Sequence, residues 1–161
     1  MQIHSLEIDD FEDINYTLLS VHTSLEDFKL AYLLNQKLNL FLSKSKSSLE
    51  TEKNHEKSLF SVYEYQDDSQ LRNWYLISNK HQGLSKKPLQ NDLFGGVYES
   101  MTKTSYLIPE KKNTDYLLKI EGGFDSYSVR ETIQSINNIQ QISTSYSIDT
   151  TTLKSKDFLI F

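Results

Sequence analysis

Apolar and polar residues alternate, or apolar residues cluster in short runs, at several places along the chain. Because successive side chains of a strand point to opposite faces, these runs predict strands. Two other windows repeat apolar residues with helical spacing. The predicted strands cover residues 15–22, 38–43, 59–65, 74–78, 141–148 and 157–161, with two more around Tyr106 and Tyr116, and the predicted helices cover 25–36 and 128–138.

These elements indicate an α+β fold: a mixed or mostly antiparallel sheet with two main helices, both on one face. Each helix stands between two strands, so we expect β-α-β-like units near both ends of the chain. With 161 residues, the chain has the length of one domain, covering residues 1–161. A domain of this size buries roughly 70% of the surface of its unfolded chain.

Two polar segments interrupt the pattern. Between His81 and Lys103 the periodicity fails, and glycines and Pro88 punctuate the sequence. This stretch exceeds an ordinary connection of about 4 to 6 residues. We therefore predict that residues 81–103 form a long loop that is either mobile or a partner segment. Residues 44–57, rich in Ser, Lys and Glu, predict another loop.

The first predicted helix is apolar on two sides, although a sheet can cover only one of them. Steps of 100° place Leu25, Phe28, Ala31 and Tyr32 on one side, and Leu30, Leu33 and Leu34 on roughly the opposite side. We take the Leu30, Leu33, Leu34 side as the candidate partner interface. The alternative is internal cover by the long loop or by residues 158–161.

The run from Tyr106 to Tyr116 joins two apolar segments through a polar turn, which predicts a hairpin. Alternation places Glu110 on the side of core residues, where its pKa would rise and acid-base chemistry becomes possible. Two structural roles compete with that hypothesis. Glu110 could accept backbone N–H bonds across the 111–113 turn, or its charge could block strand addition at an edge.

Ile108, Pro109, Glu110, Asp115 and Tyr116 match a motif, with Thr114 where the motif has Val. On these residues the chain resembles the small bacterial proteins called the IPExxxVDY family. Residues 25–27, 30–35 and 153–157 are also similar to the family. The resemblance implies no established biochemical activity, and it makes Pro109, Glu110, Asp115 and Tyr116 the candidate motif site.

Composition narrows the classes of partner. The net charge of -5 argues against a general attraction to nucleic acid. The chain contains no cysteine, which excludes disulfides and thiolate metal sites and fits a reducing compartment. No long apolar run or signal-peptide pattern opens the sequence. We therefore expect a cytoplasmic protein with no membrane partner.

Other chemical candidates are weak, and we predict no metal site, catalytic residue or cofactor. The four histidines lack ligand spacing. A hydrogen bond from His22 to Asp27 could imitate a base and its orienting group, yet a structural histidine at a helix entry is the simpler explanation. Gly122 and Gly123 could approach a phosphate, although a glycine pair commonly serves turn geometry. Likewise, the acidic residues 9–13 fit a solvated turn better than a cation site.

Three functions remain open. The first is a non-enzymatic adaptor or regulatory protein that binds a protein partner or forms a homodimer. The second is a domain that senses a small molecule near Gly122 and Gly123 or between protomers. The third is a hydrolase-like enzyme that uses Glu110 and a histidine, and this last class requires a pocket where the two side chains meet.

Overall fold

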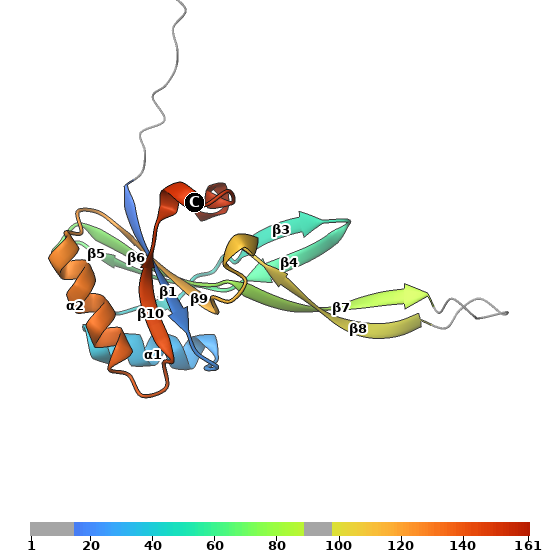
Figure 1. Cartoon of the computed structure of the whole chain (residues 1–161), viewed down its shortest axis with the longest axis horizontal. Helices are drawn as coiled ribbons and strands as arrows, with labels where there is room; N and C mark the ends of the chain where they lie inside the picture. The colour runs from blue at the N-terminus through green and yellow to red at the C-terminus, as the bar shows by residue number, and fades with distance from the viewer. Residues whose placement is uncertain (1–14, 89–97) are drawn as a thin grey trace, which may run out of the picture.

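The computed structural model describes residues 15–88 and 98–161. These residues form a six-stranded sheet, two α-helices and two separate hairpins (Figure 1). Neighbouring strands of the sheet follow the order β10-β1-β9-β6-β5-β2, and every pair is antiparallel, so the predicted α+β class is confirmed. The sheet strands are β1 Tyr16–His22, β2 Ser43–Lys44, β5 Val62–Asp67, β6 Arg72–Ser78, β9 Tyr116–Glu121 and β10 Thr144–Ile148.

The helices are α1, Asp27–Leu38, and α2, Ser126–Asn137. α1 leads from β1 to β2, and α2 leads from β9 to β10. In each unit the two strands run parallel to each other without being neighbours, because antiparallel strands lie between them. The predicted β-α-β-like units therefore exist in a split form.

Residues 38–43 were predicted to be a strand, but only the short β2 forms, starting at Ser43. α1 continues to Leu38 and ends at Asn39, whose φ of 54° is left-handed and closes the helix. The amide side chain of Asn35 then donates to the Leu42 carbonyl and accepts from the Leu42 N–H. These bonds replace the ladder that a longer strand would have made.

Both helices cover one face of the sheet. α1 buries Leu30 and Leu34, and α2 buries Ile136, in one cluster with sheet residues such as Trp74 and Leu118. Burial of an aliphatic side chain of this size contributes about 1.5–3 kcal/mol. The prediction that the helices share one face is confirmed.

The C-terminal segment covers the opposite face. It forms a 3-10 helix, Lys156–Leu159, instead of the predicted short strand. Leu159 is fully buried beside Leu18, Ile77 and Leu117 of the sheet. The tail therefore lies on the far side of the sheet from α1, and it does not cover that helix.

A buried lysine lies under the tail. The Nζ of Lys119 is 2.6 Å from a carboxylate oxygen of Glu121, and the side chain of Lys119 is 1% exposed. The rings of Tyr16, Tyr75 and Phe161 surround the ammonium with centroids 5.1, 5.3 and 4.5 Å away. Because an unpaired buried charge would cost several kcal/mol, the carboxylate and the rings are what make this burial tolerable.

Residues 81–103 are not the long loop predicted from sequence. β7, Lys80–Pro88, pairs antiparallel with β8, Tyr98–Tyr106, and the hairpin extends away from the sheet (Figure 1). Only residues 89–97 of the predicted loop lie outside the described part of the chain. The Glu56 carboxylate accepts from Ser85 and pairs with Lys103 at the side of this hairpin.

The polar segment 44–57 also differs from prediction. β3, Leu49–Lys53, pairs antiparallel with β4, Glu56–Phe60. Asn54 and His55 join these strands with φ values of 54° and 62°. Two successive left-handed residues are the backbone of a tight hairpin turn, because that turn matches the twist of the strands.

The outer edge of β10 is occupied by a side chain of α2. Asn137 accepts a hydrogen bond from the Ser145 N–H at 2.7 Å and donates to the Ser145 carbonyl at 3.0 Å. These are the two backbone bonds that a neighbouring strand would make. Asn137 thus takes the place of a strand residue at this edge.

Candidate functional site

The residues of the predicted motif site lie between β8 and β9, but the two strands do not pair. β8 pairs with β7, whereas β9 lies between β1 and β6, so the predicted hairpin around Tyr106 and Tyr116 is wrong. Ile108 is fully buried, and a 3-10 helix, Pro109–Lys111, follows it. Pro109 opens this turn, where its missing N–H costs nothing.

Asn79, which the sequence analysis missed, organises this segment. Its side chain is fully buried. The amide nitrogen donates to the carbonyls of Lys111 and Thr114, both at 2.9 Å, and the amide oxygen accepts from the Ile108 N–H at 2.8 Å. A single amide thus bonds three backbone groups, and the Lys111 carbonyl also accepts from the Thr114 N–H at 2.9 Å.

Asp115 connects three elements. One carboxylate oxygen accepts from the Thr23 N–H at 3.0 Å, just before α1 begins. The other is 2.5 Å from the Lys80 ammonium, at the base of β7. Asp115 itself immediately precedes β9, so its carboxylate holds the starts of β9, β7 and the α1 connection together.

Tyr116 has a comparable structural role. Its hydroxyl donates to the Leu25 carbonyl at 2.7 Å. Desolvation, with the nearby charges of Asp27 and Asp115, raises the pKa of Tyr116 to about 12. Its proton is therefore retained at neutral pH, and the phenol acts as a donor at the start of α1 rather than as a base.

Glu110 is exposed and does not point toward the core as predicted. Its carboxylate accepts from the Ser155 N–H at 2.7 Å and from the Ser155 hydroxyl at 2.9 Å. Partial desolvation raises the pKa of Glu110, but hydrogen bonds from its own N–H and from Ser155 and Lys154 outweigh that effect and place the pKa below 4.5. The hypothesis of a raised pKa for Glu110 is therefore wrong. Glu110 does accept a backbone N–H bond, but from Ser155 rather than from the 111–113 turn.

Replacing Glu110 with glutamine is expected to lower the free energy of unfolding by about 1 kcal/mol at pH 7, because hydrogen bonds to an exposed carboxylate are weakened by solvent. Because the pKa of Glu110 is lower in the folded chain than in the unfolded chain, the ionised carboxylate stabilises the fold at pH values above the ordinary pKa of 4.5. This stabilisation is lost as the pH falls through the pKa of the folded state. Urea denaturation at pH 7 and pH 3 measures both effects. The two proteins should differ less at pH 3, and an equal or larger difference there would contradict the assignment.

The histidine arrangements proposed from sequence do not form. His22 stacks on Tyr146 and hydrogen-bonds its hydroxyl at 3.2 Å, instead of binding Asp27. Among the hydrogen bonds of the described residues, none joins Glu110 to a histidine. In residues 15–88 and 98–161, no group of three or more potential metal ligands comes together. The acidic residues 9–13 lie outside the described part of the chain.

Gly122 and Gly123 form a turn in which only Gly122 is constrained. Gly122 has a φ of 97°, and a Cβ there would lie 2.4 Å from the Leu71 carbonyl oxygen. The hypothesis of turn geometry is therefore sufficient to explain Gly122. The Gly123 carbonyl accepts from the Arg72 side chain at 3.2 Å, which links this turn to the β5–β6 turn.

The residues predicted to form a partner interface are on α1, but two of the three lie on its buried side. Leu30 and Leu34 are fully buried within the chain and cannot meet a partner. Leu33 is only partly buried, because it lies at the flank of the buried stripe. The opposite side is open: Phe28 is 54% exposed and Tyr32 is 60% exposed.

Phe28 and Tyr32 belong to an apolar groove of about 500 Å³. Leu25 and Leu33 form its floor, since both are partly buried against the core. Lys29 and Gln141 complete the lining. We refer to this surface, lined by Leu25, Phe28, Lys29, Tyr32, Leu33 and Gln141, as the α1 groove.

In comparisons with known proteins, the chain matches no family model, no curated protein and no solved structure. The resemblance carried by residues 108–116 therefore stays a prediction. Within residues 15–88 and 98–161, none of the helices is long and apolar enough to cross a membrane.

Proposed function

We propose that this chain is a non-enzymatic protein-binding protein, that the α1 groove is its contact surface, and that its partner is a second copy of the chain. The exposure of Phe28 and Tyr32 next to partly buried Leu25 and Leu33 is the observation that carries this proposal. Aromatic side chains that present area at low entropic cost are enriched in protein interfaces.

A two-fold symmetric contact suits the spacing of these side chains. Residues four apart lie one turn apart on the same side of a helix. When two α1 helices pack antiparallel about a two-fold axis, each Phe28 faces the Tyr32 of the other copy, so the same patch is used twice. A contact limited to one helix face falls at the small end of interface sizes, which predicts a dissociation constant of roughly tens of micromolar.

The motif site supports a non-enzymatic role. Glu110, Asp115 and Tyr116 of this site, and Asn79 beside it, all use their polar groups in hydrogen bonds or ion pairs within the chain. We also propose that the protein works in the cytoplasm and belongs to the IPExxxVDY family. The cysteine-free composition and the motif at residues 108–116 support these two proposals.

Sedimentation equilibrium over a concentration series tests the dimer. The mass should rise from that of one chain, 18.8 kDa, toward twice that value as concentration increases through the predicted dissociation constant. The double variant Phe28→Ser, Tyr32→Ser should remain monomeric, because it removes the apolar area without touching the buried side of α1. A matched control is Leu84→Ser on β7, which removes a leucine that is 79% exposed elsewhere.

The control should associate as the unmodified chain does. A mass of 18.8 kDa at every concentration for the unmodified chain would contradict the proposed partner. A double variant that still dimerises would contradict the proposed surface. Circular dichroism of the double variant should match the unmodified spectrum, because both side chains are largely exposed.

A further inference from the structure

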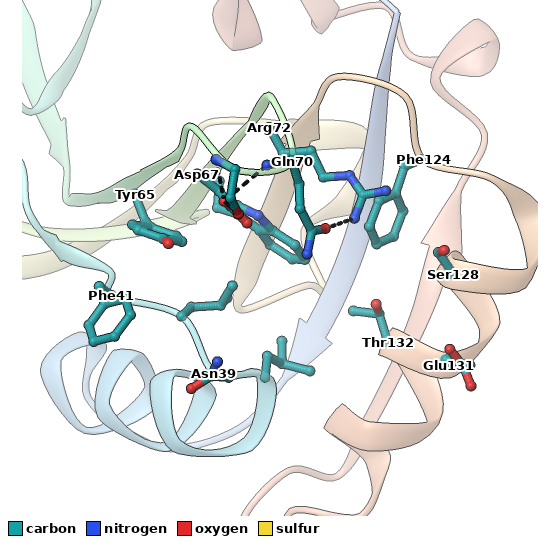
Figure 2. A pocket seen from close by; sticks show the side chains of 14 residues that line it. Asn39, Phe41, Tyr65, Asp67, Gln70, Arg72, Phe124, Ser128, Glu131 and Thr132 are labelled. Carbon is teal, nitrogen blue, oxygen red and sulfur yellow. Dashed lines mark hydrogen bonds between the residues drawn. The ribbon is translucent and has the colours of Figure 1, made fainter.

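A second cavity, separate from the α1 groove, opens on the helix side of the sheet. It has a volume of about 340 Å³ and lies between the C-terminal end of α1, the β5–β6 turn and the start of α2 (Figure 2). Small-molecule sites usually have volumes of about 300–1,000 Å³. This cavity is therefore large enough for one small ligand.

Aromatic rings form much of the cavity wall. Phe41 and Tyr65 pack edge to face with centroids 5.6 Å apart, and they lie together at one side (Figure 2). Trp74 and Phe124 make a second edge-to-face pair, also at 5.6 Å. Phe41 remains 69% exposed although its ring packs on Tyr65. An apolar ligand group would cover it.

The indole of Trp74 contributes an unused donor. Trp74 is 5% exposed, and its Nε1–H has no hydrogen-bond acceptor among the described residues. Leaving a buried donor unpaired costs about 1–3 kcal/mol. Trp74 lines the cavity, but Nε1 itself is covered in this structure, so a ligand that brings an acceptor would remove this cost once the neighbouring side chains move enough to uncover Nε1.

Charges of both signs surround the opening. The Arg72 guanidinium lies 4.7 Å from the Phe124 ring centroid and donates to the Gln70 side chain at 2.5 Å (Figure 2). Asp67 lies on the same turn, and the hydrogen bond from the Ser69 hydroxyl is the main reason that its pKa is lowered, so it is anionic at neutral pH. Glu131 of α2 adds a second carboxylate on the opposite side (Figure 2).

We infer that this cavity binds a free α-amino acid with an apolar or aromatic side chain. The ligand carboxylate accepts from the Trp74 N–H and Arg72, its ammonium meets the carboxylate of Asp67 or Glu131, and its side chain packs on Phe41 and Tyr65. A ligand with only a carboxylate would leave two anions of the protein facing it. One with only an ammonium would leave the Trp74 donor unpaired. A zwitterion meets both requirements, because its two charges are close together.

The chain contains one tryptophan, so a uniformly ¹⁵N-labelled sample gives one indole N–H resonance, and that resonance reports on the cavity. Titration with L-phenylalanine, and separately with L-leucine, should shift it saturably. 3-Phenylpropanoate lacks the ammonium and phenethylamine lacks the carboxylate. Each should bind at least about tenfold more weakly than L-phenylalanine, since a lost charge pair of about 1.4 kcal/mol is a factor of ten.

If the indole resonance does not move with about 10 mM of either amino acid, the affinity is negligible and the inference is overturned. It would also be overturned if either truncated compound bound as tightly as L-phenylalanine. This inference goes beyond the proposed function: the α1 groove and the cavity have different lining residues, so failure of dimerisation leaves the cavity assignment intact.

Variants separate ligand contact from a structural effect. Asp67→Asn, Glu131→Gln keeps both shapes and removes both anions, so it should weaken L-phenylalanine binding at least about tenfold. Binding of 3-phenylpropanoate should not weaken, because that compound has no ammonium to lose a partner. Equal losses for both ligands would overturn the assigned ion pair. Glu52→Gln on β3, an exposed site away from the cavity, is the matched control and should bind as the unmodified chain does.

Discussion

Replacing Asn79 with alanine is expected to lower the free energy of unfolding by about 3–5 kcal/mol, because the Ile108 N–H and the Thr114 carbonyl lose their partner inside the protein and the Lys111 carbonyl keeps only the Thr114 N–H. The total free energy of unfolding of an ordinary domain is about 5–15 kcal/mol, so this loss is large. Urea denaturation followed by circular dichroism measures it as a fall in the transition midpoint.

Two further variants define this result. Asn113→Ala changes an exposed asparagine in the same turn and should alter the free energy of unfolding by less than about 0.5 kcal/mol. Asn79→Asp keeps the shape but removes the amide donors, so it should destabilise the fold about as much as alanine at neutral pH. If Asn79→Ala is no more destabilising than Asn113→Ala, the central role of this amide is refuted.

Glutamate at position 34 is expected to unfold the chain, whereas glutamate at position 32 should leave it folded. Leu34 is fully buried between α1 and the sheet, and a carboxylate there has no partner. The cost combines the lost leucine packing, about 2–5 kcal/mol, with burial of a charge. Tyr32 is 60% exposed on the opposite side of the same helix.

The dispersion of amide resonances at 25 °C distinguishes the two variants. Leu34→Glu should show the narrow dispersion of an unfolded chain, and Tyr32→Glu the dispersion of the unmodified protein with a stability change of about 1 kcal/mol or less. Both substitutions introduce the same side chain into the same helix, so helix propensity and net charge cannot explain a difference. A folded Leu34→Glu variant would contradict the assignment of the buried side.

The sequence predicted those helices and strands whose buried residues recur with a regular spacing. β1, β6 and β9 contribute residues to both faces of a covered sheet, and their apolar character is strong. The sequence pattern predicts that α2 begins at Ser128, about two residues late, whereas Asp125 is the N-cap and its carboxylate accepts from the Ser128 N–H at 2.6 Å. Both residue types cap helices well, so local sequence alone left the boundary undetermined.

The polar hairpins could not be predicted from periodicity. β7 and β8 project from the sheet (Figure 1) and contain many Lys, Ser and Thr residues, and none of their side chains at residues 80–85 and 100–106 is fully buried, so no buried face forces alternation there. β3 and β4 are similarly polar and use cross-strand charges such as Glu50 with Lys57, 2.7 Å apart. Their turn is formed by Asn54 and His55, and histidine is not a common signal of a left-handed residue.

The candidate site was found in part. Sequence selected α1 because two sides of it are apolar, and one side is indeed exposed. It could not show which side is exposed, because the leucines and the aromatic residues are similarly apolar. The elements that pack against α1 determine which side is buried. Asn79 and Trp74 were missed for another reason: their roles depend on backbone groups and cavity walls that are distant in sequence.

The side chain of Asn137 restricts how copies of this chain can assemble. An extended segment arriving at the outer margin of β10 would find the amide and carbonyl of Ser145 already engaged, and it would have to displace two hydrogen bonds before making its own. Continuous sheets that grow from one molecule to the next are therefore disfavoured at this margin. At this margin, contacts between copies are left to side chains rather than to backbone pairing.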